Sequence, residues 1–214
     1  MSHDLKKYYY ECLAKNILEK YQSYQLGELI LSDKPDLRSA VGIGIEVTRA
    51  VFDGFEEKSN YFNKYLKMKK TPDVEKQRID NFIKDGTRIF YYNDMICGYV
   101  PPAIWYGIDE LKNIYEKKRR KLCSYNFLKA VHLFIFSPSF NDYEKSDIEK
   151  FMEWISQNKN NEKDYDVIYI YQENILFICN VASHSIMEIV LDKSIIHQCC
   201  VYAKNYAQNT EVTP

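Results

Sequence analysis

The segment 35–48 constrains the fold of this chain more than any other. It contains a Pro-Asp pair and, after a short gap, a run in which isoleucine and valine alternate with glycine, glutamate and threonine. Such alternation is typical of a strand with two different faces. We therefore expect antiparallel strands at 36–40 and 41–50, with Asp36 and Glu46 on the same face. The glycines on the acidic face leave room for a substrate to approach.

The rest of the chain interleaves helical and strand patterns, which predicts an α/β fold with a mixed sheet flanked by helices. The run 26–31 is open to either a helix or a first strand. Residues 54–85 read as charged helices and 86–108 as irregular, so we expect a helical and loop insertion at about 54–108 within a single domain, 1–214. The remaining expected elements are helices at 4–21, 109–127, 145–157 and 194–205, and strands at 131–136, 167–171 and 175–180.

Composition narrows the class of protein. Lys and Arg number 29 and Asp and Glu number 30, so the net charge of −1 counts against a dedicated non-specific binder of polyanions. No apolar run approaches the roughly 20 residues that cross a bilayer, so no membrane partner is expected. The six cysteines form no Cys-x-x-Cys pair, and we expect reduced thiols in a cytoplasmic protein.

At its Pro-Asp segment the chain resembles the PD-(D/E)XK phosphodiesterase superfamily, which has the restriction-endonuclease-like fold. The matching residues are Pro35-Asp36 and Glu46-Val47-Thr48, and the run 114–136 resembles the core helix and following strand of that fold. The chain is similar in particular to uncharacterised bacterial and phage members with Glu-Val-Thr in the second half of the motif. The resemblance implies hydrolysis of phosphodiesters in nucleic acid, DNA in preference to RNA.

The resemblance also implies a metal site. Asp36 and Glu46 would hold Mg²⁺ or Mn²⁺, and the main-chain carbonyl of Val47 would complete the ligands. Glu28 either adds a further carboxylate or is an exposed helical glutamate. Thr48 departs from the family, which places a lysine there, because threonine cannot provide a cation.

The helix expected at 109–127 offers a replacement for that lysine. Lys118 and Lys121 fall within its apolar stripe, at a spacing of three, and would therefore face the sheet. One of them either completes the catalytic set beside Asp36 and Glu46, or both pack their stems along the core edge with their amines in water.

Basic clusters supply a candidate groove for nucleic acid, at Lys69 and Lys70 and at Lys117 and Arg120. The predicted partner is nucleic acid, and a homodimer is left open. Two alternatives stand beside the nuclease: a catalytically weakened protein of the same fold that binds nucleic acid or a protein partner, and a plain interaction domain. Adjacent carboxylates with a lysine amine favour the nuclease, adjacent carboxylates alone favour the weakened protein, and carboxylates pointing apart favour the interaction domain.

Overall fold

The computed structural model describes residues 3–51, 79–80, 83–84, 88–92, 95–100, 107–125, 127–137, 143–159 and 163–210. The chain forms two compact units. The first combines Met1–Ala50 with Gly107–Pro214, and the second is Val51–Tyr106, which is inserted between them.

The first unit is built on a seven-stranded mixed sheet in the order β1-β2-β3-β6-β7-β8-β9. The three central strands β3, β6 and β7 run parallel, and the neighbours on both sides pair antiparallel. The mixed sheet confirms the predicted α/β class. The strands are β1 (Leu29–Leu31), β2 (Leu37–Ser39), β3 (Ile43–Arg49), β6 (Ala130–Phe136), β7 (Val167–Gln172), β8 (Ile175–Asn180) and β9 (Ser185–Val190).

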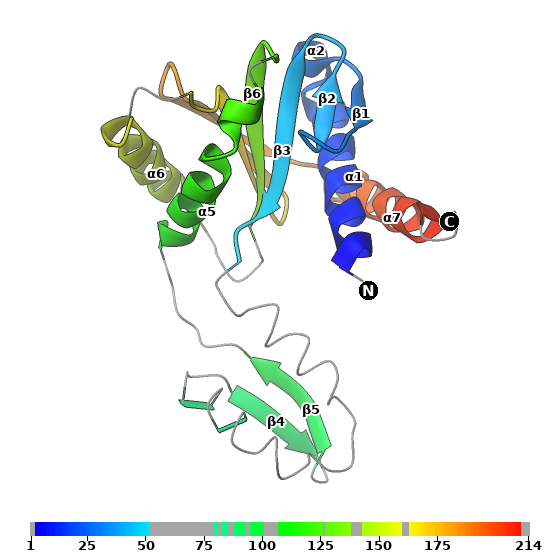
Figure 1. The fold of residues 1–214 in the computed structure, drawn as a ribbon. Helices are drawn as coiled ribbons and strands as arrows, with labels where there is room; N and C mark the ends of the chain where they lie inside the picture. The colour runs from blue at the N-terminus through cyan, green and yellow to red at the C-terminus, as the bar shows by residue number, and fades with distance from the viewer. Residues whose placement is uncertain are drawn as a thin grey trace. The chain divides into compact units, whose positions relative to one another are not determined.

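Helices cover both faces of this sheet (Figure 1). One face packs against α1 and α7, which lie side by side, and the other against α5 and α6. Strand β6 has apolar side chains on both of its faces because helices cover both faces of the sheet. Phe134 packs in the core on the α1 side and Leu133 in the core on the α5 side. The helices are α1 (His3–Tyr21), α2 (Ser23–Leu26), α5 (Asp109–Arg119), α6 (Lys145–Gln157) and α7 (Lys193–Thr210), with a 3-10 turn η1 (Leu122–Tyr125).

Three details differ from the sequence expectations. The helix expected at 109–127 ends at Arg119 and is followed by η1. The open run 26–31 contains both the end of α2 and strand β1. Strand β9 was not predicted, because it is an edge strand whose residues are mostly exposed and lack a regular apolar alternation.

The second unit contains a hairpin of β4 (Arg88–Tyr92) and β5 (Met95–Val100), paired antiparallel. The expectation that residues 86–108 are irregular is therefore wrong for these two segments. The aromatic residues of β4 already had strand character, but glycines and prolines on either side favoured a loop. The charged helices expected at 54–85 lie almost wholly outside the described residues. In the described part of the chain, no helix is long and apolar enough to cross a membrane.

Candidate functional site

The site begins where strands β2 and β3 separate. Their pairing joins Arg38 to Gly44 and Leu37 to Ile45 and then stops. At the next position the Val47 amide N–H donates to Asp36 Oδ2 at 2.7 Å, so a side chain takes the place of a partner strand. This register brings Asp36 beside Glu46, as the sequence predicted, and both carboxyl groups are buried.

Glu46 is held from the α5 side of the sheet. The Lys118 amine donates to Glu46 Oε2 at 2.8 Å and to the Val47 carbonyl at 3.3 Å. The Tyr125 hydroxyl, from η1, donates to the other oxygen, Oε1. Glu46 is only 4% exposed, so the ammonium group compensates a charge that burial would otherwise make costly.

The two carboxyl groups influence each other through space. Burial and the neighbouring charge of Glu46 raise the pKa of Asp36, against the amide hydrogen bond from Val47 and the charge of Lys118. Burial and the hydrogen bond to Glu46 also raise the pKa of Tyr125, which keeps its hydroxyl a donor. The site thus concentrates negative charge in a buried place, and Lys118 forms an ion pair with Glu46 there.

Sequence reasoning missed a third acid, Glu11 of α1. Its carboxyl group lies close enough to Asp36 to feel its charge, and burial together with that charge raises the pKa of Glu11 to about 7. Lys7 forms an ion pair with it at 3.5 Å. A signal was present in the sequence, because Glu11 has helical spacing to the buried Ala14 and Leu18 on the same face of α1.

Several predicted site residues lie elsewhere. Glu28 is exposed and does not join the carboxylates, so Glu11 of α1 is the acid that lies against Asp36 instead. Lys121 is also exposed, because α5 has ended and the chain turns through a bond from the Lys121 amide to the Lys118 carbonyl. Thr48 is half-buried on β3, two residues beyond Glu46.

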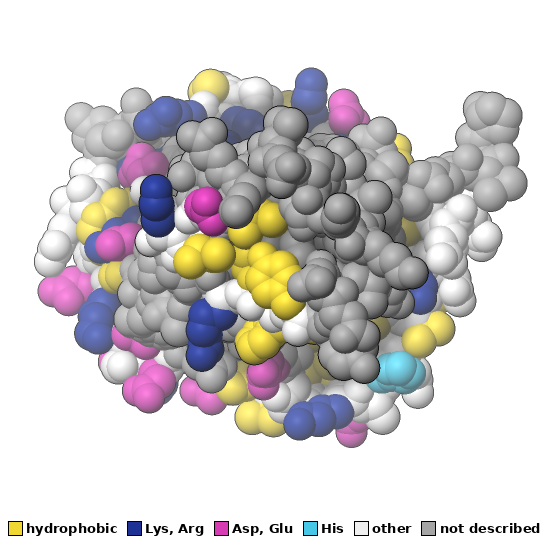
Figure 2. Space-filling view, turned by 90° about the horizontal axis from the view of Figure 1, so that it is seen from below, with side chains coloured by type: hydrophobic (Ala, Val, Ile, Leu, Met, Phe, Trp, Pro, Cys, Tyr) yellow, Lys and Arg dark blue, Asp and Glu magenta, His cyan; other side chains and the backbone are white. Residues whose placement is uncertain are grey.

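The predicted basic groove is only partly described. Lys117 and Arg120 are exposed on α5 and the turn after it, and Lys69 and Lys70 lie outside the described residues. Arg119, between the two exposed residues, is buried and donates to the Asn158 carbonyl at 3.1 Å. On the face shown in Figure 2, basic and acidic side chains of the described residues are interspersed. The charge on this face is therefore mixed in sign.

The oxygen ligands available at the site suit a hard divalent cation. Two carboxyl groups and the Val47 carbonyl are oxygen ligands, and Mg²⁺ is usually held by one or two carboxylates while it keeps several waters. Burial and the charge of Glu46 raise the pKa of Asp36, and a bound cation would favour its charged form. Within the described ranges, no group of three or more His, Cys, Asp or Glu side chains is arranged to hold a metal by itself. The residues therefore fit an ion that takes the rest of its ligands from water and substrate.

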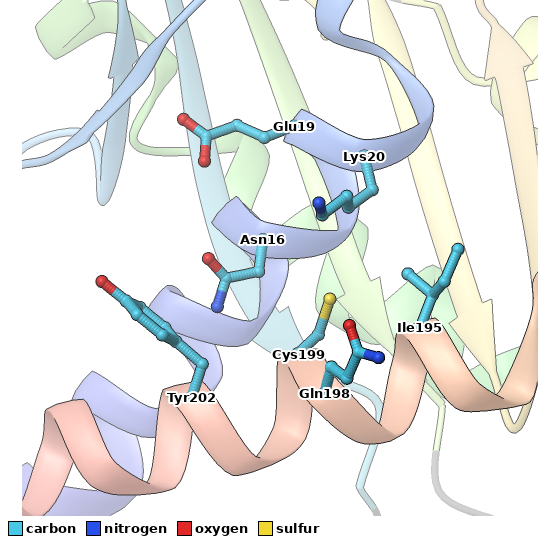
Figure 3. A pocket seen from close by; sticks show the side chains of 7 residues that line it. All are labelled: Asn16, Glu19, Lys20, Ile195, Gln198, Cys199 and Tyr202. Carbon is cyan, nitrogen blue, oxygen red and sulfur yellow. The ribbon is translucent and has the colours of Figure 1, made fainter.

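A separate groove of about 350 Å³ lies between α1 and α7, on the far face of the sheet from Lys118 (Figure 3). It contains none of the groups that surround Asp36 and Glu46. Its acid, Glu19, already accepts from the Leu29 amide and pairs with Lys15. The groove is lined by Asn16, Glu19, Lys20, Ile195, Gln198, Cys199 and Tyr202.

Comparison of the chain with protein-family models, with curated proteins and with solved structures found no significant match. The functional assignment therefore rests on the geometry around Asp36, Glu46 and Lys118.

Proposed function

We propose that this chain is a metal-dependent phosphodiesterase of the restriction-endonuclease-like fold that hydrolyses nucleic acid, DNA in preference to RNA. The observation that carries the proposal is the contact of the Lys118 amine with Glu46, beside Asp36, at the point where β2 and β3 separate. It supplies the cation that Thr48 cannot supply. The order β2, β3, α5 and β6, with β6 parallel to β3, also supports this fold.

Each side chain has a role in this proposal. Asp36 and Glu46, with the Val47 carbonyl, would hold Mg²⁺ or Mn²⁺. When bound, the ion activates water and neutralises charge on the phosphate. Lys118 orients Glu46 and presents a fixed positive charge to the negative charge that develops on the phosphoryl oxygens. Tyr125 fixes the second oxygen of Glu46.

A catalytically weakened protein that binds nucleic acid or a protein partner is the second candidate. The observation that favours it is that Lys118 and Tyr125 already contact both oxygens of Glu46, and Lys118 also contacts the Val47 carbonyl. In such a protein Lys118 would serve as a permanent counter-ion, and no metal would bind.

A substrate panel separates the two candidates. Plasmid, single-stranded DNA and RNA are incubated with the full chain in Mn²⁺, in Mg²⁺ and in EDTA, beside an Asp36→Ala protein. The proposal expects metal-dependent cutting, fastest on DNA, that Asp36→Ala loses. Folded protein that binds nucleic acid and cuts none of these substrates would favour the weakened protein. Cutting that survives in Asp36→Ala would contradict the site.

A further inference from the structure

An exposed aromatic ring lies next to an arginine on the face of the sheet that carries the candidate site. The guanidinium group of Arg38 is 5.1 Å from the centre of the Phe127 ring. Phe127 is 63% exposed, although it is a large apolar side chain. The guanidinium lies over the ring, and most of the side chain remains exposed.

Strand register places this pair beside Glu46. Arg38 lies directly opposite Gly44, and Glu46 is two residues further along β3. Side chains two residues apart point to the same face, about 7 Å apart along the strand. Arg38 is therefore on the face of the sheet that holds Glu46 and Lys118, one step along the strands from Glu46.

The segment after η1 is fixed to the same place. A methyl group at Gly44 would lie 2.4 Å from Leu128 Cδ1, so the residue after Phe127 packs directly on β3. Tyr125, two residues before Phe127, donates to Glu46. The ring is thus carried by a short segment that is anchored at both ends to the strand of the candidate site.

The guanidinium group of Arg38 can bind an anion, because no described carboxylate neutralises its charge. Its Nη2 donates to the Lys34 carbonyl, and its Nε is buried without a hydrogen-bond partner, so an anion would be bound through the Nη atoms. Among the described residues no carboxylate forms an ion pair with it, in contrast to Arg119, which has two. A guanidinium that is not neutralised by an acid is suited to a phosphate, and Lys129, exposed nearby on the same segment, adds a second positive charge.

We propose that Phe127 and Arg38 form a binding subsite for one unpaired nucleotide of single-stranded nucleic acid. The base stacks on the exposed Phe127 ring, and its phosphate is bound by Arg38. A base inside a duplex cannot offer its face to a side chain, whereas an unpaired base can. The inference rests on the proposed function, and it specifies that function as acting on single-stranded or locally unpaired substrates.

The test measures binding without cleavage. Single-stranded DNA and RNA oligonucleotides that carry 2-aminopurine are titrated in EDTA with the full chain, and a duplex with the same label is the third probe. Aminopurine fluorescence is quenched when the base stacks on an aromatic ring. We expect quenching with the single strands and none with the duplex. The comparison of DNA with RNA shows which sugar the subsite accepts.

Variants assign the effect to this pair. Phe127→Ala should weaken binding about tenfold and abolish the quenching, because one base stack is lost. Phe127→Trp should keep both the wild-type affinity and the quenching. Arg38→Gln should lower the salt dependence of binding by about one phosphate contact. Tyr202→Ala is the matched control, since Tyr202 is 61% exposed on α7, and it should bind as the wild type does.

The outcomes separate this inference from the proposed function. Equal binding by Phe127→Ala and the wild type, an equal loss in Tyr202→Ala, or no binding of single strands would overturn the subsite, whatever the cleavage assay shows. Phe127-dependent quenching without any metal-dependent cleavage would support the subsite and contradict hydrolysis.

Discussion

The Lys118 amine lies 2.8 Å from Glu46 Oε2, although the two residues are 72 positions apart in the sequence. The contact joins α5 to β3 and provides the positive charge that the strand itself lacks at Thr48. Because the same amine reaches the Val47 carbonyl, its position is fixed by two acceptors. A cation held in this way is prepared for charge that develops during a reaction.

Replacement of this lysine should remove activity while the fold remains. We expect Lys118→Met to lower the rate of metal-dependent cleavage by about 10²–10³-fold, as the loss of a fixed charge-stabilising group does. Lys121→Met, three residues along and exposed, is the matched control and should cut at the wild-type rate. Cleavage time courses measure both, and circular dichroism checks folding. Equal rates for wild type and Lys118→Met would contradict the role of this residue.

Metal binding should raise the thermal stability of the protein. An ion at about 100 times its Kd stabilises the folded state by about 2.7 kcal/mol, which for a chain of this size raises Tm by about 5–10 °C. We expect Mn²⁺ to raise Tm in thermal unfolding followed by circular dichroism, and EDTA to reverse the rise. Asp36→Ala should show no shift. An equal shift in that variant would place the ion elsewhere.

The pH dependence of stability should reveal the ionisation of Glu11. Its pKa is raised from 4.5 to about 7, so between these values the folded protein holds a proton that the unfolded chain has released. This stabilising contribution is complete below pH 4.5 and is lost as the pH rises through 7. In EDTA at pH 8, Glu11→Gln should therefore be more stable than the wild type by about 3 kcal/mol.

Urea unfolding at pH 5 and pH 8 measures this difference. At pH 5, where Glu11 is protonated in the folded protein, we expect the two proteins to differ little. A Glu11→Gln protein that is less stable than the wild type at pH 8 would show that the charged form is the favoured one.

His132 should make the stability of the protein depend on pH below about 6.5. Burial lowers its pKa to about 4, and its Nδ1 lies 3.2 Å from the Tyr169 hydroxyl. Between about pH 6.5 and 4 the unfolded chain takes up a proton that the folded protein does not, so stability falls as the pH falls through this window, by about 3 kcal/mol. His132→Phe should remove this part of the pH dependence of urea unfolding. If the stability of His132→Phe falls by the same amount between about pH 6.5 and 4, other groups cause the effect.

The sequence was sufficient for the parts of the site that depend on local pattern. Alternation placed Glu46 on its strand, the Pro-Asp pair placed Asp36 beside it, and helical spacing directed Lys118 at the sheet. The same spacing failed for Lys121 because it assumes that the helix continues, and α5 ends at Arg119. Where a helix ends depends on packing against the rest of the fold, which periodicity does not contain.

Long-range packing accounts for the remaining differences. Glu11 meets Asp36 because α1 packs on β3 near the point where β2 leaves it, and the pattern of α1 alone does not reveal that neighbour. Strand β9 is defined by its pairing with β8 and has an exposed, irregular pattern. Tertiary contacts rather than intrinsic preference determine such edge strands.

The most direct test of the central claim is single-turnover cleavage of labelled DNA in Mn²⁺ by two matched variants. Asp36→Asn keeps the shape of the buried carboxyl group and removes its charge. Asp33→Asn makes the same change at an exposed aspartate three residues away. We predict that Asp36→Asn cuts at least about 10²-fold more slowly than the wild type while Asp33→Asn cuts at the wild-type rate. Equal rates for the two variants would contradict a hydrolytic centre at Asp36, Glu46 and Lys118.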